Sequence, residues 1–290
     1  GMVFCPVNFR LSAKEITDCM DNSRPKVFLL EPETQAEVDM ALRRTAHAPQ
    51  ILLTTDARAA HAYAGFTADC PATEPELPWE LSVYDETLRL FTSGTTGRQK
   101  SVCLTSINEV LSAHDVMIHF PFSFTDRSMN TTPWFHRGGL HSGGITPTLY
   151  AGGTVIIQRK FQPEKTLDMV QQYGLTFLIG VPNVLELLAE AQQKQPRDLS
   201  SLRGIVTMGS PLERADCIRY QKILTKRIFN GYGTTETFWN TFLRPDDLPE
   251  MAGSAGRSCV DDDVRVIKVY EDRVAEPDDL AATDGSEVGE

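Results

Sequence analysis

The stretch Leu175-Thr-Phe-Leu-Ile-Gly-Val181 decides the fold of this 290-residue chain. It is a short apolar run placed directly after Gly174, a pattern typical of a buried β-strand. A helical pattern over residues 183–195 follows it, with Leu185 and Leu188 on one face. A buried strand that runs directly into an amphipathic helix predicts a β-α-β unit.

The same alternation continues on both sides of this strand. We expect strands over residues 153–158, 204–208 and 227–230. We expect helices over residues 163–173 and 213–224. Strands alternating with helices predict right-handed connections and a largely parallel sheet, so the expected fold class is α/β with α-β-α layers. In such sheets ligands bind beyond the carboxyl ends of the strands.

The flanking regions contain weaker signals of the same kind. Short strands are predicted over residues 26–30, 51–54 and 88–92. Capping boxes, in which a hydroxyl and a carboxylate satisfy free amides at a helix start, are predicted at Ser12–Glu15, Thr34–Glu37 and Ser106–Glu109. The last of these opens a helix to about His119. The alternating stretch Asp263–Tyr270, followed by Arg273-Val-Ala275, predicts a β-hairpin.

Composition excludes several classes of protein. The net charge of −11, with Lys and Arg scattered along the chain, disfavours nucleic acid as a partner, because phosphates would be repelled. No apolar run approaches the roughly 20 residues that a membrane-spanning helix needs. None of the six cysteines forms a CxxC pair, so we expect reduced thiols in a cytoplasmic protein.

The strongest motif is Thr92-Ser-Gly-Thr-Thr-Gly-Arg-Gln-Lys100. Glycines allow close backbone approach, hydroxyls and amides can donate to phosphate oxygens, and Lys100 adds a positive charge. The Walker A pattern requires Gly-Lys-Ser/Thr after its spacer, and Gln99 breaks that pattern. A phosphate-binding loop outside the P-loop NTPases is therefore expected.

This loop resembles that of the adenylate-forming superfamily, which contains acyl-CoA synthetases, luciferases and peptide-synthetase adenylation domains. Gln99 stands where the family usually has proline. Further segments resemble family motifs in the family's order: Val3–Arg10, Pro133-Trp-Phe-His-Arg-Gly-Gly139, Gly204–Pro211, Asn230-Gly-Tyr-Gly-Thr-Thr-Glu236 and Ala252–Arg257. The resemblance covers nearly the whole chain and implies part of the N-terminal domain of such an enzyme.

The resemblance implies ATP, Mg²⁺ and coenzyme A as cofactors and co-substrates. It assigns nucleotide binding to Thr92, Ser93, Gly94, Thr95, Thr96, Gly97, Gly209, Ser210, Pro211, Asn230, Gly231, Tyr232, Gly233, Thr234, Thr235 and Glu236. The Tyr232 ring would stack on adenine, and Thr95 and Glu236 would hold the metal, as their hard oxygen atoms suit. Lys100, Thr235 and His136 are the expected catalytic residues.

The expected acyl pocket is lined by Trp134, Phe135, His136, Gly138, Thr237, Phe238 and Trp239. A lone histidine is more often structural than functional, but His136 lies inside the aromatic motif. Peptide-synthetase adenylation domains place an aspartate beside that aromatic residue to pair with the substrate ammonium. By this resemblance His136 occupies that place, so a carboxylic acid without a free ammonium group is the expected substrate.

The resemblance further implies a division of the chain. Residues 1–87 would form the start of the AMP-binding domain, 88–260 its core with both nucleotide motifs, and 261–290 a β-hairpin opening the next subdomain. The usual beginning of the domain, a later Thr-Gly-Asp motif and the C-terminal lid domain are not in this sequence. The expected activity is an AMP-forming acid–thiol ligase that is weak as this chain alone. An amino-acid adenylation domain and a nucleotide-binding remnant are the alternatives, and a homo-oligomer is possible.

Overall fold

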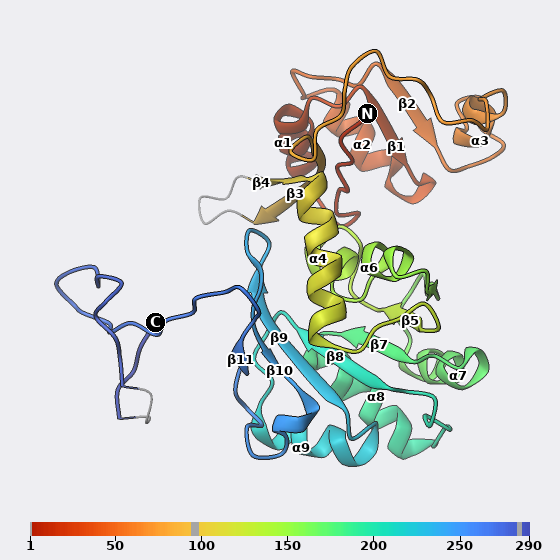
Figure 1. Ribbon diagram of the computed structural model, residues 1–290. Helices are drawn as coiled ribbons and strands as arrows, with labels where there is room; N and C mark the ends of the chain where they lie inside the picture. The colour runs from red at the N-terminus through yellow and green to blue at the C-terminus, as the bar shows by residue number, and fades with distance from the viewer. Residues whose placement is uncertain (1, 94–98, 283–285) are drawn as a thin grey trace. The chain divides into compact units, whose positions relative to one another are not determined.

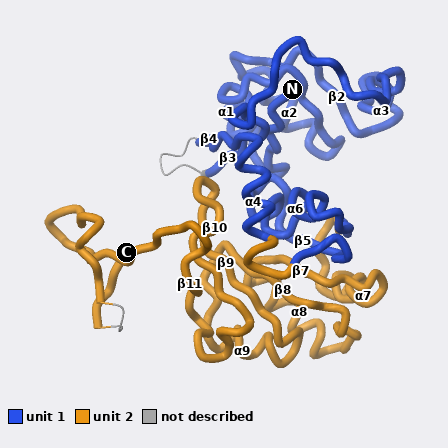
Figure 2. The backbone as a smooth tube through the Cα atoms, in the orientation of Figure 1, with its two compact units in different colours: residues 1–116, 122–157 blue, residues 117–121, 158–290 orange. Residues whose placement is uncertain are grey.

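The structure is a computed structural model, and it describes residues 2–93, 99–282 and 286–290, with only the backbone of Ser93. The chain divides into two compact units. Unit 1 contains residues 1–116 and 122–157, and unit 2 contains residues 117–121 and 158–290 (Figure 2). Helix α4 (Ser106–His119) begins in unit 1, and its last residues belong to unit 2.

Unit 1 begins with helices packed around a short parallel strand pair. Strands β1 (Val27–Leu30) and β2 (Ile51–Thr54) pair in parallel, and helices α1 (Ala13–Ser23) and α2 (Gln35–Leu42) pack on each other (Figure 1). Their core consists of Ile16, Met20, Leu30, Val38 and Ala41. A short helix, α3 (Tyr63–Thr67), follows β2.

The rest of unit 1 presents the first motif and the aromatic–histidine motif. Strands β3 (Glu86–Ser93) and β4 (Gln99–Thr105) form an antiparallel pair. The elements that follow α4 are β5 (Arg127–Asn130), α5 (Arg137–His141), α6 (Ile145–Tyr150) and β6 (Thr154–Val155), with β5 and β6 parallel.

Unit 2 contains the β-α-β units that the central stretch predicts. Its elements are α7 (Pro163–Tyr173), β7 (Phe177–Gly180), α8 (Pro182–Lys194), β8 (Gly204–Met208), α9 (Arg214–Ile223), β9 (Ile228–Thr234), β10 (Phe238–Leu243) and β11 (Arg257–Ser258). Strands β7, β8 and β9 are parallel neighbours, and α8 packs against α7 and α9 (Figure 1). The mixed α/β fold with a mostly parallel sheet is therefore confirmed.

An aromatic cluster fills the core of unit 2. Phe120 contacts the rings of Phe177, Phe229, Trp239 and Phe242 at centroid distances between 5.0 and 6.3 Å. All residues of β7 and β8 are buried, as expected of parallel strands covered on both faces. This packed interior holds the carboxyl ends of β8 and β9 in place.

One of the three predicted capping boxes is formed and two are not. The Ser12–Glu15 capping box is formed, with both reciprocal contacts present. The box at Thr34 is wrong, because the Thr34 hydroxyl donates to the carbonyl of Glu31 and the Glu37 carboxylate accepts from the backbone N–H of Ala13.

The box at Ser106 is also wrong, although helix α4 covers the predicted residues. The backbone N–H and hydroxyl of Thr105 donate to Asn108, and Glu109 instead contacts His141. Tertiary contacts and a competing local acceptor have taken the expected partners.

The predicted C-terminal hairpin is wrong within the described residues. Residues 263–270 do not pair with 273–275; isolated antiparallel bridges join Ile267 to Leu280 and Lys268 to Gly289. Ion pairs of Arg265 with Asp263 and of Arg273 with Asp279 lie along this segment. The alternating pattern identified extended backbone but not its partner, which lies farther along the chain.

Candidate functional site

The carboxyl ends of β8 and β9 bring two predicted nucleotide segments together. Met208, the last residue of β8, is the register partner of Gly231 in β9. The turn Gly209-Ser210-Pro211 therefore leaves the sheet next to Tyr232, and all three of its residues are exposed. Gly209 has φ of 83°, in the left-handed region that favours glycine, and this lets the chain turn at the strand end.

Tyr232 is the first exposed residue of β9, after the buried residues Ile228, Phe229, Asn230 and Gly231. Its side chain is 56% exposed, whereas Asn230 is 6% exposed. The Asn230 Oδ1 atom is buried and has no hydrogen-bond partner in the described residues. A free aromatic ring face beside an unsatisfied buried acceptor and an exposed turn suits a planar, hydrogen-bonding base such as adenine.

The two glycines of this motif are required by close packing. A Cβ atom at Gly231 would lie 2.8 Å from the Trp239 Nε1 atom. A Cβ atom at Gly233 would lie 1.4 Å from the carbonyl oxygen of Phe238. Strand β10 therefore approaches β9 so closely that a side chain at Gly233 has no space.

The turn between β9 and β10 carries a polar network. The Thr234 and Thr237 hydroxyls lie 3.1 Å apart, and the Thr237 hydroxyl donates to the Asn240 side chain at 2.8 Å. Asn240 is the extra residue of a β-bulge between Trp239 and Thr241. Glu236 lies in this turn, is exposed, and makes no hydrogen bond or ion pair within the described residues. Thr235 is half-buried.

This turn fits the expected metal ligand in part. Glu236 offers an uncommitted carboxylate beside hydroxyl groups, the donor type that Mg²⁺ prefers. Thr95, the other expected ligand, lies outside the described residues, as do Gly94, Thr96 and Gly97. Within the described residues, His, Cys, Asp and Glu side chains form no cluster of three or more that could hold a metal ion.

Unit 1 carries the rest of the first motif on two paired strands. Thr92 on β3 is the register partner of Lys100 on β4, and Ser93 is the partner of Gln99. Lys100 is exposed. The strand pair therefore brings both ends of the predicted phosphate loop side by side.

The aromatic–histidine motif is anchored in unit 1 by apolar and edge-on contacts. Trp134 packs against the core cluster of Leu88, Leu90, Leu104 and Leu140. Phe135 contacts Phe9 edge-on at 5.9 Å and the His136 ring at 4.3 Å. Gly138 is half-buried in α5. The His136 side chain is exposed, but loss of water around its ring, and then the positive charge of Arg10, lower its pKa below 6.5.

Phe238 and Trp239 lie in the core of unit 2, 5% and 4% exposed. Trp239 stacks on Phe238 at 4.8 Å and contacts Phe242 at 4.6 Å. Thr237 is exposed in the turn. The role of these three residues in an acyl pocket stays a prediction.

Sequence reasoning missed His119, at the end of α4. Its ring is 3% exposed, and Arg244 donates to its Nδ1 atom at 3.1 Å. Desolvation, and then the charge of Arg244, lower its pKa to about 4. Only the position of His119 at the end of a predicted helix marked it in the sequence.

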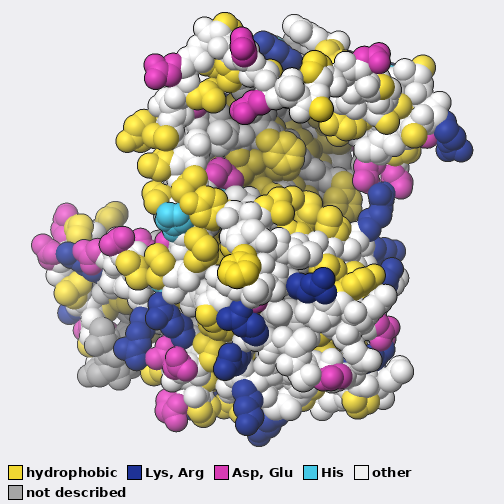
Figure 3. Space-filling model, turned by 45° about the vertical axis from the view of Figure 1, so that its right-hand side comes forward, with side chains coloured by type: hydrophobic (Ala, Val, Ile, Leu, Met, Phe, Trp, Pro, Cys, Tyr) yellow, Lys and Arg dark blue, Asp and Glu magenta, His cyan; other side chains and the backbone are white. Residues whose placement is uncertain are grey.

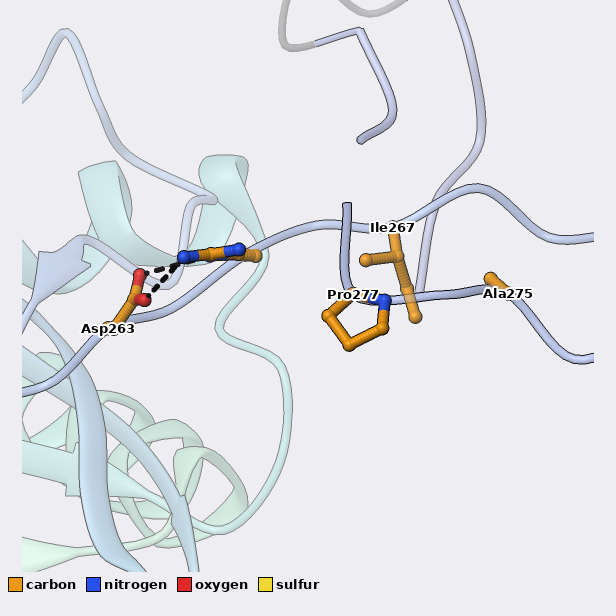
Figure 4. A pocket seen from close by; sticks show the side chains of 5 residues that line it. Asp263, Ile267, Ala275 and Pro277 are labelled. Atoms are coloured by element: carbon orange, nitrogen blue, oxygen red, sulfur yellow. Dashed lines mark hydrogen bonds and ion pairs between the residues drawn. The ribbon is translucent and has the colours of Figure 1, made fainter. Parts of the chain in front are cut away.

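Two surface features lie apart from these motifs. A depression of about 530 Å³ is lined by Asp263, Arg265, Ile267, Ala275 and Pro277, all from the C-terminal segment (Figure 4). Lys and Arg side chains are dispersed among Asp and Glu on the face in Figure 3. No helix among the described residues has the length and apolar character to cross a membrane.

Comparison with known proteins identifies the family and the fold of this chain. The model of the family "AMP-binding enzyme" matches residues 1–282. The chain is 32% identical to the indoleacetate–CoA ligase of Aromatoleum aromaticum and 31% identical to a feruloyl-CoA synthase of Amycolatopsis, covering 92% of this chain in both cases and 52% and 51% of those proteins. A fatty acyl CoA synthetase of Mycobacterium tuberculosis has the same fold, with a TM-score of 0.80 at 24% identity, over 94% of this chain and 52% of that one.

The chain belongs to the AMP-binding enzyme family. It spans about half the length of the curated relatives that it matches. Its fold is that of the N-terminal domains of adenylate-forming enzymes.

Proposed function

We propose that this chain provides the nucleotide- and acyl-binding part of an AMP-forming acid–thiol ligase. The observation that carries the proposal is the junction of β8 and β9, where the exposed Tyr232 follows the buried Asn230 on β9 next to the exposed Gly209–Pro211 turn. The family match and the acyl-CoA ligase relatives support the same reaction class.

The proposed reaction has two steps. A carboxylate oxygen attacks the α-phosphorus of ATP, the bond to the β-phosphate breaks, and pyrophosphate leaves. The sulfur of a thiol such as coenzyme A then attacks the carbonyl carbon of the acyl-adenylate, AMP leaves, and the thiol loses its proton. This chemistry depends on positioning and charge neutralisation rather than on a covalent enzyme intermediate.

Residues of this chain would contribute in distinct ways. Tyr232 would stack on adenine, and Thr235 and Lys100 would donate to phosphate oxygens. Glu236, with Thr95, would hold Mg²⁺, which supplies neutralisation of phosphate charge when it is bound. His136 would border the acyl group.

The proposed substrate is an aromatic or other apolar carboxylic acid without a free ammonium group. The Phe135 ring contacts His136 and is itself contacted by Phe9, while Trp134 packs against the apolar cluster of Leu88, Leu90, Leu104 and Leu140. Among the described residues, no acidic side chain contacts the rings of Phe135 or His136. Two relatives act, by their names, on indoleacetate and on ferulate, which are aromatic acids.

The test is a thermal-shift panel with ATP, Mg²⁺ and individual acids. Indoleacetate or ferulate should raise the midpoint beyond ATP alone, and alanine and phenylalanine should not, because a substrate ammonium would lack a carboxylate partner. Stabilisation by amino acids only would replace this proposal with amino-acid adenylation. Pyrophosphate release by the chain and by a longer version of the protein then measures how much of the turnover these residues support.

Replacing Tyr232 by alanine should weaken AMP binding by about tenfold, because an aromatic stacking partner contributes about 0.5–1.5 kcal/mol beyond the area that it buries. Isothermal titration calorimetry with AMP measures this effect. Tyr173→Ala is the matched control, since Tyr173 is a 39% exposed tyrosine of α7 in the same unit. Equal AMP affinity in both variants would remove Tyr232 from the nucleotide site.

A further inference from the structure

A polar clamp joins helix α4 to helix α5, the short helix that follows His136. The Nε2 atom of His141 lies 2.9 Å from each carboxylate oxygen of Glu109. The Nη2 atom of Arg137 donates to the Ser112 hydroxyl at 3.1 Å. Glu109 and Ser112 are three residues apart and lie on one face of α4, and Arg137 and His141 are four apart and lie on one face of α5.

Three of the four clamp residues are buried in unit 1, and the side chain of the fourth, Glu109, is 23% exposed. His141 is 0% exposed, Ser112 3% and Arg137 7%. The Nδ1 atom of His141 also lies 3.3 Å from the carbonyl oxygen of Arg137, so both ring nitrogens face oxygen acceptors. Buried polar contacts of this kind are costly to break, because the separated groups cannot return to water.

The clamp extends to His136 through the backbone. His136 is the N-cap residue of α5, and its carbonyl accepts from the N–H groups of Gly139 and Leu140. Its own N–H donates to the carbonyl of Pro133 at 3.1 Å. A Cβ atom at Gly139 would lie 2.2 Å from that carbonyl oxygen, so α5 packs directly on the segment that carries Trp134 and Phe135.

The other end of α5 is held as well. The Asn130 side-chain amide donates to the carbonyls of Gly138 at 2.8 Å and Ser142 at 3.2 Å. The Asn130 side-chain oxygen accepts from the backbone N–H of Thr132. Asn130 therefore holds the backbone of α5, while Glu109 and Ser112 contact two of its side chains, those of His141 and Arg137.

We infer that Glu109, through His141, is a positioning residue for His136, and that Ser112 assists it through Arg137. This inference rests on the proposed function, in which His136 borders the acyl group. The sequence pattern suggested a different role for Glu109, as part of a capping box, which the structure does not form. Its carboxylate instead sets the orientation of the neighbouring helix.

The test measures binding of a non-hydrolysable indoleacetyl-adenylate analogue and of AMP to the whole chain by calorimetry. Glu109→Ala should weaken binding of the analogue about tenfold and leave AMP binding unchanged, as expected for loss of one hydrogen bond between the Glu109 carboxylate and the buried His141 ring. Glu109→Gln should restore much of the affinity, because its side-chain oxygen can still accept from His141. His114→Ala is the control, an exposed residue of α4 that contacts Tyr150 and not α5.

A double-mutant cycle separates positioning from general destabilisation. If Glu109 acts through His136, Glu109→Ala should cost little further affinity in a His136→Ala background. Additive losses in the cycle would overturn the inference.

A ligand-free readout keeps the two proposals distinguishable. The His136 Cε1–Hε1 resonance should shift in Glu109→Ala and stay in place in His114→Ala. An unmoved resonance overturns the clamp's role, even where the analogue binds to the wild-type chain. If the resonance shifts in Glu109→Ala but the wild-type chain does not bind the analogue, the proposed function alone would be refuted.

Discussion

Gly233→Ala should destabilise unit 2 by about 4 kcal/mol or more, a cost reserved for changes that a packed structure cannot accommodate. The added methyl group would lie 1.4 Å from the Phe238 carbonyl oxygen, a backbone atom that no rotamer change can move. Strands β9 and β10 would have to separate, and Trp239 would lose its place in the aromatic cluster. The Tyr232 site should fail with them, so AMP binding is also expected to disappear.

Urea unfolding followed by tryptophan fluorescence and circular dichroism measures this loss. Gly65→Ala provides the contrast, because a Cβ atom at Gly65 has no neighbour within 4 Å. Gly65 lies in helix α3, where alanine is favoured over glycine by up to about 1 kcal/mol. Equal unfolding midpoints for Gly233→Ala and the wild type would show that β10 does not approach β9 as described.

Acidification should destabilise the chain through His119 by about 3 kcal/mol in total. Folding lowers the pKa of His119 from 6.5 to about 4, so the unfolded state binds the extra proton first. The contribution is fully present above pH 6.5, is lost as the pH falls from there to about 4, and changes no further below. The cause is a buried ring whose Nδ1 atom accepts from Arg244, a contact that protonation would replace with repulsion.

Urea midpoints between pH 7.5 and pH 4 measure the slope. His119→Asn should lower stability at pH 7.5, because it removes ring contacts with Trp239 and Phe242, but it should flatten the pH dependence in this window. His47→Asn is the control, since His47 lies in unit 1 outside this cluster. An unchanged slope in His119→Asn would assign the acid sensitivity to other groups.

The sequence was sufficient for the β-α-β part of unit 2 because its local signals agree with its packing. Helix α7 and strand β8 match their predicted bounds, Pro163–Tyr173 and Gly204–Met208, since each has strong end signals or uniform burial. The predicted strand 227–230 identified the start of β9, which continues to Thr234 and so includes the exposed Tyr232.

What the sequence did not provide depends on contacts between distant residues. Nothing near Glu109 indicates that its carboxylate meets His141, 32 residues away. Similarly, Phe238 and Trp239 follow a nucleotide motif, and only the pairing of β10 with β9 places them in the core. A buried histidine such as His119 gives no periodic signal by which it could be found.

The bulge at Asn240 makes the proposed nucleotide motif, residues 230–236, structurally dependent on strand β10, which follows it. Asn240 is the extra residue of the bulge, and its side-chain oxygen accepts a hydrogen bond from the Thr237 hydroxyl. The Thr237 hydroxyl lies 3.1 Å from the Thr234 hydroxyl, so Asn240 is linked to the turn through Thr237. A graft of residues 230–236 onto another sheet would transfer the motif residues without the hydrogen bond from Thr237 to Asn240. The smallest transferable cassette is the whole hairpin, residues 228–243, and directed recombination between relatives should place its crossover points outside those limits.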